Sequence, residues 1–341
     1  MNRKKFFVAA MAAVSIFSMP LATYAANSAT EKLIQIEEDT YGTEQVGAIL
    51  NRISKIEKDY TGKNMQGNMN ARIDAAYDNL YSNFGEPSII SKVNALEWNF
   101  NREVQSGGID KRLSALENEI LGKATAGNFS ERIRELSKAS FGGENVPLVE
   151  LQVPANTLVK VALVDSITSK TLQVGDVVKI KVAEDVIVDG NLIFAKGLQG
   201  IGKVAAVRKA KGWMGTNGKV DIDFDELRTI DGRSIETFVG EEAKQKMIDE
   251  QMIDGASLVA MNLNDDWNKV LVRGKNIEIK PGTELYIQTK NNSSVHALST
   301  ENGNLQLSST LTTQEIPETK NSTFEEEVIS EEDNFYLEDE E

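Results

Sequence analysis

The chain has 341 residues, with 52 acidic and 37 basic side chains, one histidine and no cysteine. Cysteine nucleophiles, disulfides and thiolate zinc sites are therefore excluded, and a single histidine cannot build a histidine-rich metal site. The formal net charge of −15 argues against a nucleic acid as partner.

The N-terminus is organised like a secretory signal peptide. Three basic residues precede an apolar run over 6–17, and the small residues Thr23 and Ala25 permit cleavage before Ala26. This run is short for a membrane-spanning helix, so we expect residues 1–25 to be removed and no integral membrane segment to remain. An exported protein without cysteine is typical of bacteria, which predicts a location in the periplasm, the cell envelope or outside the cell.

Residues 27–145 contain a repeat with a period of 20 residues. Each copy has a basic residue followed at once by an aliphatic one, with a second apolar residue three positions later. The basic residues are Lys32, Arg52, Arg72, Lys92, Arg112 and Arg132. Apolar spacing such as Ile109, Leu113 and Leu116 predicts a helix, and glycines such as Gly122 suit the left-handed residue that ends one. We therefore expect a helical repeat array.

Four copies place an acid five residues after the basic residue, at Glu37, Glu57, Glu97 and Glu117. We expect these acids to pair with basic residues of neighbouring helices. The third and fourth copies depart from the pattern, since Ser82 and Arg102 replace the first glycine and Pro87 replaces the second. The array is expected to bend or loosen there. The repeats either form a rod or concave surface that binds a partner, or act as a spacer whose units only support one another.

After Pro147 the helical spacing gives way to alternating Val and Ile residues, which are typical of short strands. The expected strands are VKVALV, DVVKIKVAEDVIV, GKVAAV, KVDIDF and ELYIQT, with turns at 188–191 and 230–233. They predict a small β-barrel or sandwich over residues 146–290, with a helical insert at 241–253. The expected fold class is therefore α+β and multi-domain, a helical array followed by a mainly-β domain.

Residues 153–204 carry a set of turn and strand positions that belong together. They are Pro154 and Thr157, Ser166 and Ser169, Asp185 and Val186, Lys196 and Gly197, and Gly202 and Val204. With these positions the segment resembles the TrbI-like β-barrel domain of conjugal-transfer and type IV secretion channel proteins, and residues 219–235 are similar to the strand and Asp-Gly turn that follow in that family. The resemblance implies a barrel fold and a role beside a secretion or conjugation channel. The pairing of helical repeats with such a barrel resembles uncharacterised envelope proteins of bacteria.

The remaining motifs favour a protein without a chemical site. Asp221, Asp223 and Asp225 begin like a calcium loop, but the glycine and the final acid of such a loop are missing, which favours one exposed face of a strand. His296 is expected in a solvated loop. The sequence therefore predicts no catalytic, cofactor-binding or metal residues and no cofactor. A pair of hydrolytic carboxylates has no fixed sequence spacing, which keeps an envelope hydrolase open as a third hypothesis.

One basic and aromatic stretch is a candidate interaction site. Arg208, Lys209 and Lys211 flank Trp213 and Met214 in a glycine-rich segment. This basic tip is interpreted as a contact for an anionic envelope polymer, a membrane surface or another protein. The alternative is a flexible hairpin loop with ordinary lysines.

Residues 291–341 are expected to be a polar, acidic and disordered tail. They are rich in Ser, Thr and Asn, and residues 315–341 hold twelve acids and one lysine. Such composition cannot bury enough apolar surface to fold. The tail is expected to contact basic partners or cations, or only to add solubility.

Together these observations predict a non-catalytic exported envelope protein that works as a structural or interaction module. Its expected partners are an envelope protein or a glycan, and a homo-oligomer is a further expectation. The alternative function is an accessory of a secretion or conjugation channel.

Overall fold

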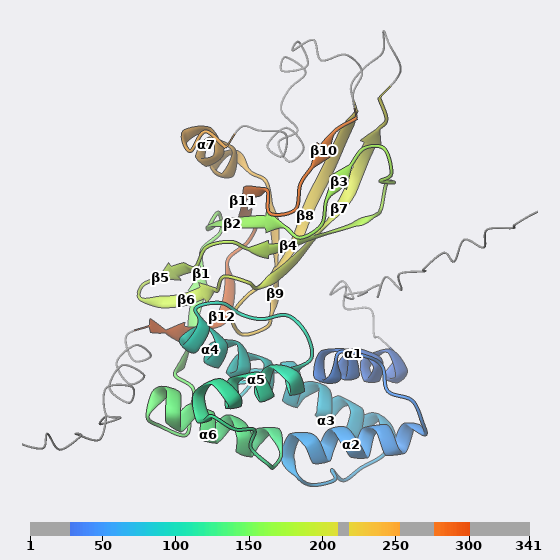
Figure 1. Cartoon of the computed structure of the whole chain (residues 1–341), viewed down its shortest axis with the longest axis vertical. Coiled ribbons are helices and arrows are strands. Elements are labelled where there is room, and N and C mark those ends of the chain that lie inside the picture. Colours follow the sequence, from blue (N-terminus) through green and yellow to red (C-terminus); the bar gives the residue numbers. More distant parts are fainter. Residues whose placement is uncertain (1–27, 211–217, 253–275, 301–341) are drawn as a thin grey trace, which may run out of the picture.

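The computed structural model describes residues 28–210, 218–252 and 276–300. The predicted signal peptide, the centre of the basic tip and residues 301–341 of the predicted acidic tail lie outside these residues. The six helices of the N-terminal part each have 13 residues, and each begins 20 residues after the one before (Figure 1). They are α1 (Ala29–Tyr41), α2 (Ile49–Thr61), α3 (Met69–Tyr81), α4 (Ile89–Asn101), α5 (Ile109–Leu121) and α6 (Phe129–Phe141). The predicted helical array and its period are confirmed.

The repeated residues fix where each helix begins and ends. Ser28, Asn68, Ser88 and Asn128 cap the first turns of their helices by accepting a hydrogen bond from a backbone N–H group. Glycine ends four of the helices in the left-handed conformation, as the spacing predicted. Arg102 adopts the same conformation at the end of α4, whereas Ser82 leaves α3 in an extended conformation.

The six helices share one apolar core rather than stacking in a line. Helix α1 contacts α3 and α5, and α2 contacts α3 and α6, so the first helices reach the last ones. The core receives buried side chains from every helix, among them Ile36, Ile56, Ile73, Leu96 and Leu113. The expected rod or concave surface is therefore wrong. Each helix has one apolar stripe, and six stripes are buried most fully when they converge.

Buried glutamates join consecutive helices, as the sequence predicted. The Arg52 guanidinium donates to both carboxylate oxygens of Glu37, at 2.8 and 2.5 Å, and Arg72 binds Glu57 in the same way at 2.7 Å. The pairs Arg112–Glu97 and Arg132–Glu117 repeat this arrangement. We call these four bidentate pairs the Glu–Arg joints. The bond to Glu57 raises the pKa of the Arg72 guanidinium further above its already high value.

The step from α3 to α4 has no such joint. Tyr77 and Lys92 occupy the positions that hold the acid and the arginine elsewhere. Lys92 makes no ion pair among the described residues, and burial lowers its pKa. The expected loosening at this step does not occur, because the barrel packs against α4 here instead.

The C-terminal part is a closed antiparallel barrel with a second sheet beside it. The barrel order is β11–β2–β4–β7–β8–β9, and it closes where β9 pairs with β11. Its strands are β2 (Leu158–Leu163), β4 (Val177–Val182), β7 (Gln199–Arg208), β8 (Lys219–Arg228), β9 (Ser234–Phe238) and β11 (Glu284–Thr289). The second sheet has the order β1–β12–β6–β5, formed by β1 (Leu148–Val153), β12 (Ser293–Ser299), β6 (Asn191–Phe194) and β5 (Val186–Val188). A short pair joins β3 (Ile167–Thr168) to β10 (Glu278–Ile279).

The barrel bears out the predicted strands and turns and corrects the end of the domain. The helical insert is α7 (Glu241–Asp249), which packs on β11. Residues 293–299, assigned to the tail from their composition, instead form β12 between β1 and β6. Val295 and Ala297 are fully buried on either side of His296. This alternation is too short to predict a strand in a segment rich in Ser and Asn. The predicted boundary at residue 290 is therefore too early.

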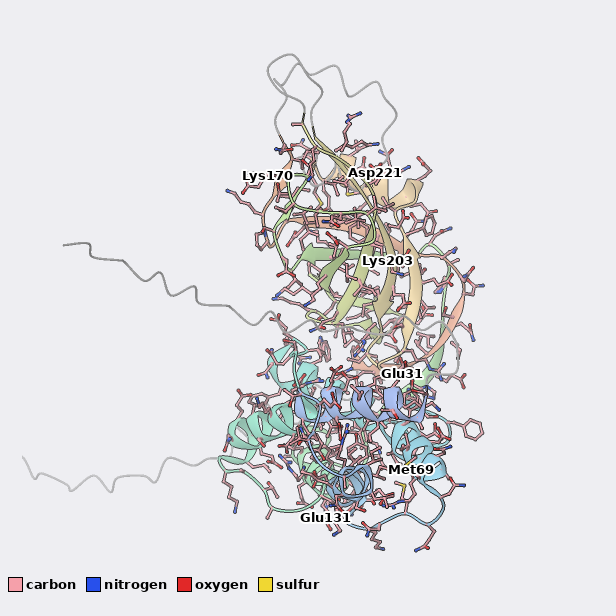
Figure 2. All side chains as sticks on the ribbon, turned by 90° about the vertical axis from the view of Figure 1, so that its right-hand side faces the viewer. Glu31, Met69, Glu131, Lys170, Lys203 and Asp221 are labelled. Atoms are coloured by element: carbon pink, nitrogen blue, oxygen red, sulfur yellow. The ribbon has the colours of Figure 1, made fainter. Side chains whose placement is uncertain are left out.

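The helices and the barrel lie end to end along the long axis of the protein (Figure 2). No helix in the described ranges is both long enough and apolar enough to cross a membrane.

We expect removal of one acid from a Glu–Arg joint to destabilise the protein strongly. Glu57→Gln leaves the largely buried Arg72 without a counter-charge, at a cost of about 3 kcal/mol in the free energy of unfolding. Urea denaturation measures this cost. The matched control is Glu135→Gln, which breaks an exposed pair with Lys138 and should cost less than about 1 kcal/mol. Equal costs for the two variants would show that the joints do not hold the helices together.

Candidate functional site

The barrel is attached to α4 through the turn between β8 and β9. Asn83 and Ser91 donate to the backbone oxygen of Asp231, at 3.1 and 2.9 Å, and Asn94 donates to that of Ile230 at 3.0 Å. All three donors are buried. The polar residues of the fourth repeat thus satisfy carbonyl groups that the turn would otherwise leave unbonded in a dry interface.

The Asp231 side chain holds this turn in shape from inside. It is fully buried and accepts hydrogen bonds from the Thr229 hydroxyl at 2.5 Å and from the backbone N–H groups of His296 and Arg233 at 2.8 and 3.3 Å. The carboxylate therefore connects the β8–β9 turn to β12. His296 lies on β12, with its Nδ1 atom 3.6 Å from Asp231, so the expectation of a solvated loop residue is wrong.

A second attachment is made by the end of α4 and the loop that follows it. The Trp98 indole donates to Asp185 at 2.8 Å, and Arg102 lies over the same indole at 4.4 Å. Burial lowers the pKa of the Arg102 guanidinium, and Asp185 partly opposes this shift. The Val104 N–H group donates to the Lys196 carbonyl at 2.8 Å. This strand-like contact ties the α4–α5 loop to the turn between β6 and β7.

Glycines allow the two parts to approach so closely. Gly232 has a φ of +79°, and a Cβ atom there would lie 2.6 Å from Cγ2 of Ile90. Gly197 has a φ of +90°, and a Cβ atom there would collide with the carbonyl oxygen of Val104. Any larger residue at these two positions would push the barrel away from the helices.

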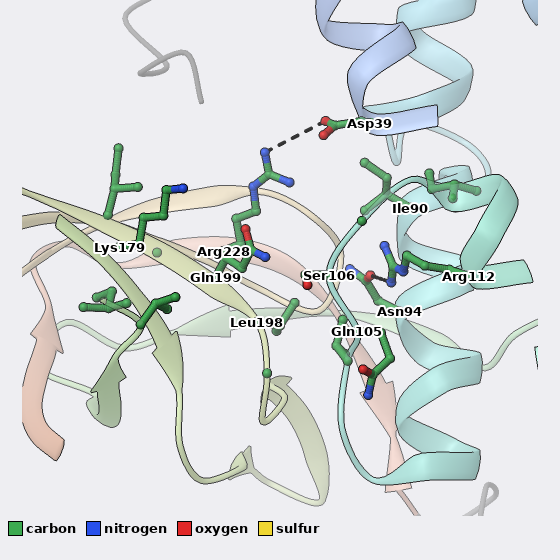
Figure 3. Close-up of a pocket in the computed structure, with 18 of the residues that line it drawn as sticks. Asp39, Ile90, Asn94, Gln105, Ser106, Arg112, Lys179, Leu198, Gln199 and Arg228 are labelled. Carbon is green, nitrogen blue, oxygen red and sulfur yellow. Dashed lines mark hydrogen bonds and ion pairs between the residues drawn. The ribbon is translucent and has the colours of Figure 1, made fainter. Parts of the chain in front are cut away.

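A cleft of about 330 Å³ remains between the two attachments (Figure 3). Its helical wall includes Ile90, Asn94 and the loop residues 105–107. Its barrel wall includes β4 and residues 197–201. The volume lies at the lower end of the range for small-ligand sites. This cleft is the candidate functional site, because it is built by both parts of the protein.

The cleft combines charged and apolar side chains. Arg112 is already paired with Glu97 and also donates to Asn94 at 2.7 Å. Arg228 lies 4.0 Å from Asp39, at the outer limit of an ion pair, and Lys179 has no ion pair within the described part of the chain. Val164 and Val177, which also line the cleft, are 41% and 54% exposed. The arrangement suits binding of a group that is both anionic and apolar.

Only two of the five residues of the predicted basic tip lie in the described part of the chain. Arg208 ends β7, Lys209 follows it, and Lys211, Trp213 and Met214 lie outside the described residues. The β7–β8 hairpin that carries the basic tip points away from the helices (Figure 1). Neither Arg208 nor Lys209 is among the residues that line the cleft.

The three alternating aspartates have the arrangement that the sequence predicted. Asp221, Asp223 and Asp225 all lie on the outer face of β8, whereas Val220, Ile222 and Phe224 point into the core. Burial raises the pKa of the Asp225 carboxyl group, and the nearby negative charge of Asp223 raises it further. Within the described ranges no three acids or histidines gather closely enough to hold a metal ion.

Comparison with known proteins supports neither a family nor a function for this chain. No protein-family model and no curated protein matches the chain. Among solved structures, it is similar to ComB10 of the Com type IV secretion system of Helicobacter pylori, at 16% identity, over 41% of this chain and 88% of that one. The TM-score is 0.23, and a likeness this weak carries no functional argument.

We expect the fit between the β8–β9 turn and α4 to be sensitive to one added methyl group. Gly232→Ala combines left-handed strain with the contact to Ile90, and should cost about 1–3 kcal/mol more than strain alone. The control is Gly282→Ala, at a φ of +80° with no atom near its added Cβ, which should cost only about 1–2 kcal/mol. Chemical denaturation compares the two. Equal losses in the free energy of unfolding would mean that the interface accommodates the added methyl group at no cost.

Proposed function

We propose that this protein is a non-catalytic exported envelope protein that acts as a scaffold or interaction module. The observation that carries the proposal is the buried interface between α4 and the β8–β9 turn. Asn83, Ser91 and Asn94 bond the turn directly, and the Asp231 side chain holds it in place. Such an interface fixes the barrel at one distance and orientation from the helices, which suits a protein that works by occupying a position.

The use of the buried acids supports the non-catalytic part of the proposal. Glu37, Glu57, Glu97 and Glu117 each bind an arginine, and Asp231 binds backbone and hydroxyl groups. A carboxylate that acts in acid–base chemistry must reach a substrate. These five are turned inward and hold elements together.

Export and the class of partner rest on the sequence. The signal-like residues 1–25 support a location in the periplasm, the cell envelope or outside the cell. An envelope protein, a glycan or a second copy of the chain is the proposed partner, with the basic tip as one proposed contact.

The alternative proposal is an accessory of a secretion or conjugation channel. It is favoured by one observation, that the segments resembling the channel-protein domain contribute β2, β4, β7 and β8 to a closed six-stranded barrel. Crosslinking in intact cells separates the two proposals, because an accessory should be recovered with channel subunits and a general scaffold with other envelope components.

If the protein works by occupancy, its effect should follow its amount and not any single exposed acid. We expect deletion of the gene to weaken the envelope or an assembly in it, and graded expression to restore it in proportion. Replacing Asp221, Asp223 and Asp225 by Asn, one at a time, should leave this restoration intact. Detergent sensitivity of the cells measures it, with export checked by fractionation. Complete loss of function in a folded and exported variant would reveal a chemical site.

The basic tip gives a separate test of the proposed partner. Replacing Lys209, Lys211 and Trp213 together by Ala should change the free energy of unfolding by less than about 0.5 kcal/mol. It should weaken binding to isolated envelope material, with the largest effect at low salt. Lys123→Ala, an exposed change on the helices, is the control. A large loss of stability would show that Trp213 belongs to the core, against the interaction hypothesis.

A further inference from the structure

We propose that the cleft between the helices and the barrel binds the acidic C-terminal segment of the same chain, residues 325–341. The inference goes beyond the proposed function and does not depend on export or on a scaffolding role. It rests on the charge, the apolar lining and the size of the cleft, and on the number of residues between the end of β12 and the acidic segment.

The barrel wall of the cleft has an excess of positive charge. Lys179 and Lys181 lie on the same face of β4, and Lys196 precedes the lining residue Gly197. Lys181 and Lys196 share a single acid, Glu103, at 3.8 and 3.6 Å. Of these cations only Lys179 lines the cleft, together with Arg228, which lies 4.0 Å from Asp39, and no acid of the barrel is among the lining residues. Residues 325–341 contain ten acids and no basic residue.

The apolar lining favours a peptide over a simple anion. Val164 and Val177 are exposed beside Lys179, and a free phosphate would leave both in water. The acidic segment has apolar residues between its acids, with the cluster Phe335, Tyr336 and Leu337 followed by four acids. Alternating acid and apolar groups therefore face alternating cations and valines, and the contact buries apolar surface as well as pairing charge.

The size of the cleft limits what it receives. A volume of about 330 Å³ holds a few side chains and not a whole 17-residue segment. We therefore place the apolar cluster 335–337 in the cleft and the flanking acids over the rim lysines.

The connection is long enough for the segment to reach the cleft. Thr300 is the last residue that the structure describes. Its N–H and hydroxyl groups both donate to the Gly190 carbonyl, at 3.1 and 2.7 Å. From Thr300 to the apolar cluster there are 35 residues. A random coil of that length would span about 30–35 Å on average, and a fully extended chain about 115 Å, so the number of residues is sufficient. Tethering at this length supplies an effective concentration on the order of millimolar, so even a weak contact would be populated.

Because the protein has no cysteine of its own, a pair of introduced cysteines tests the contact cleanly. In the full chain, Val177→Cys with Asn334→Cys should form an intramolecular disulfide at least tenfold faster than the control pair Lys170→Cys with Asn334→Cys. Lys170 lies at the end of the barrel opposite the helices (Figure 2). Circular dichroism confirms that both double variants are folded.

Charge changes then test the chemistry. Lys179→Glu in the 177/334 pair should lower the rate at least threefold, as should 0.5 M salt, whereas Lys170→Glu should leave it unchanged. Equal rates for the 177/334 and 170/334 pairs would overturn the proposal. A crosslink that forms only between molecules, with a rate that rises with protein concentration, would overturn the intramolecular contact in favour of a second copy.

Discussion

A buried carboxylate that must be satisfied at four of the five helix-to-helix steps is the constraint on which the helical part depends. In three of the four Glu–Arg joints the glutamate also accepts a backbone N–H group eight residues later, from Gln45, Gln105 or Thr125. The arginine that completes the joint comes fifteen residues after the acid. A carboxylate without these partners would be very costly to bury, and the fork of an arginine matches its two oxygens. The joint therefore fixes both the path of the loop and the position of the next helix. Because the same spacing recurs at each joint, the sequence repeats every 20 residues.

The step from α3 to α4, which lacks a Glu–Arg joint, is where the barrel attaches to the helices. Between α3 and α4 no joint forms, and polar side chains of the fourth repeat bind the barrel. Asn94 and Ser91 bond the barrel, while Asn94 still accepts from Arg112 and so stays connected to the next joint. The interface is thus continuous with the network that holds the helices. The cleft is a consequence of this docking, because two separate attachments on either side leave the space between them unfilled.

Local physics made much of the fold predictable. The helices could be placed from apolar spacing and terminal glycines, and most barrel strands from alternation with glycine turns. The strand β12 was missed because Val295 and Ala297 are its only apolar residues with a clear alternation, and their Ser and Asn neighbours are typical of tails. His296 was misplaced for the same reason. The closed arrangement of the helices was also hidden, since a stripe shows that a helix packs but not against which partner.

The cleft could not have been found from the sequence. Its lining comes from α1, α4, α5, β4, β7 and β8 and from the loops between them, and the repeat and strand patterns in these segments do not indicate that they meet. One signal was present and was misinterpreted. The irregular third and fourth repeats, with Ser82, Pro87 and Arg102, were expected to weaken the array, whereas the polar residues beside them mark an interface. A departure from a strict repeat is often where a repeat protein makes contact with something other than itself.

The shared core of the six helices has a consequence for how this protein can vary. In an open solenoid each unit contacts only its neighbours, so units are added or lost one at a time and stability changes in steps. Here α1 contacts α5 and α2 contacts α6, which leaves no free end onto which a seventh unit could stack. Duplication or loss of one 20-residue unit would disrupt every helix at once. Although its sequence is a series of repeats, we expect this part of the chain to keep a fixed number of units and to unfold as a single cooperative unit.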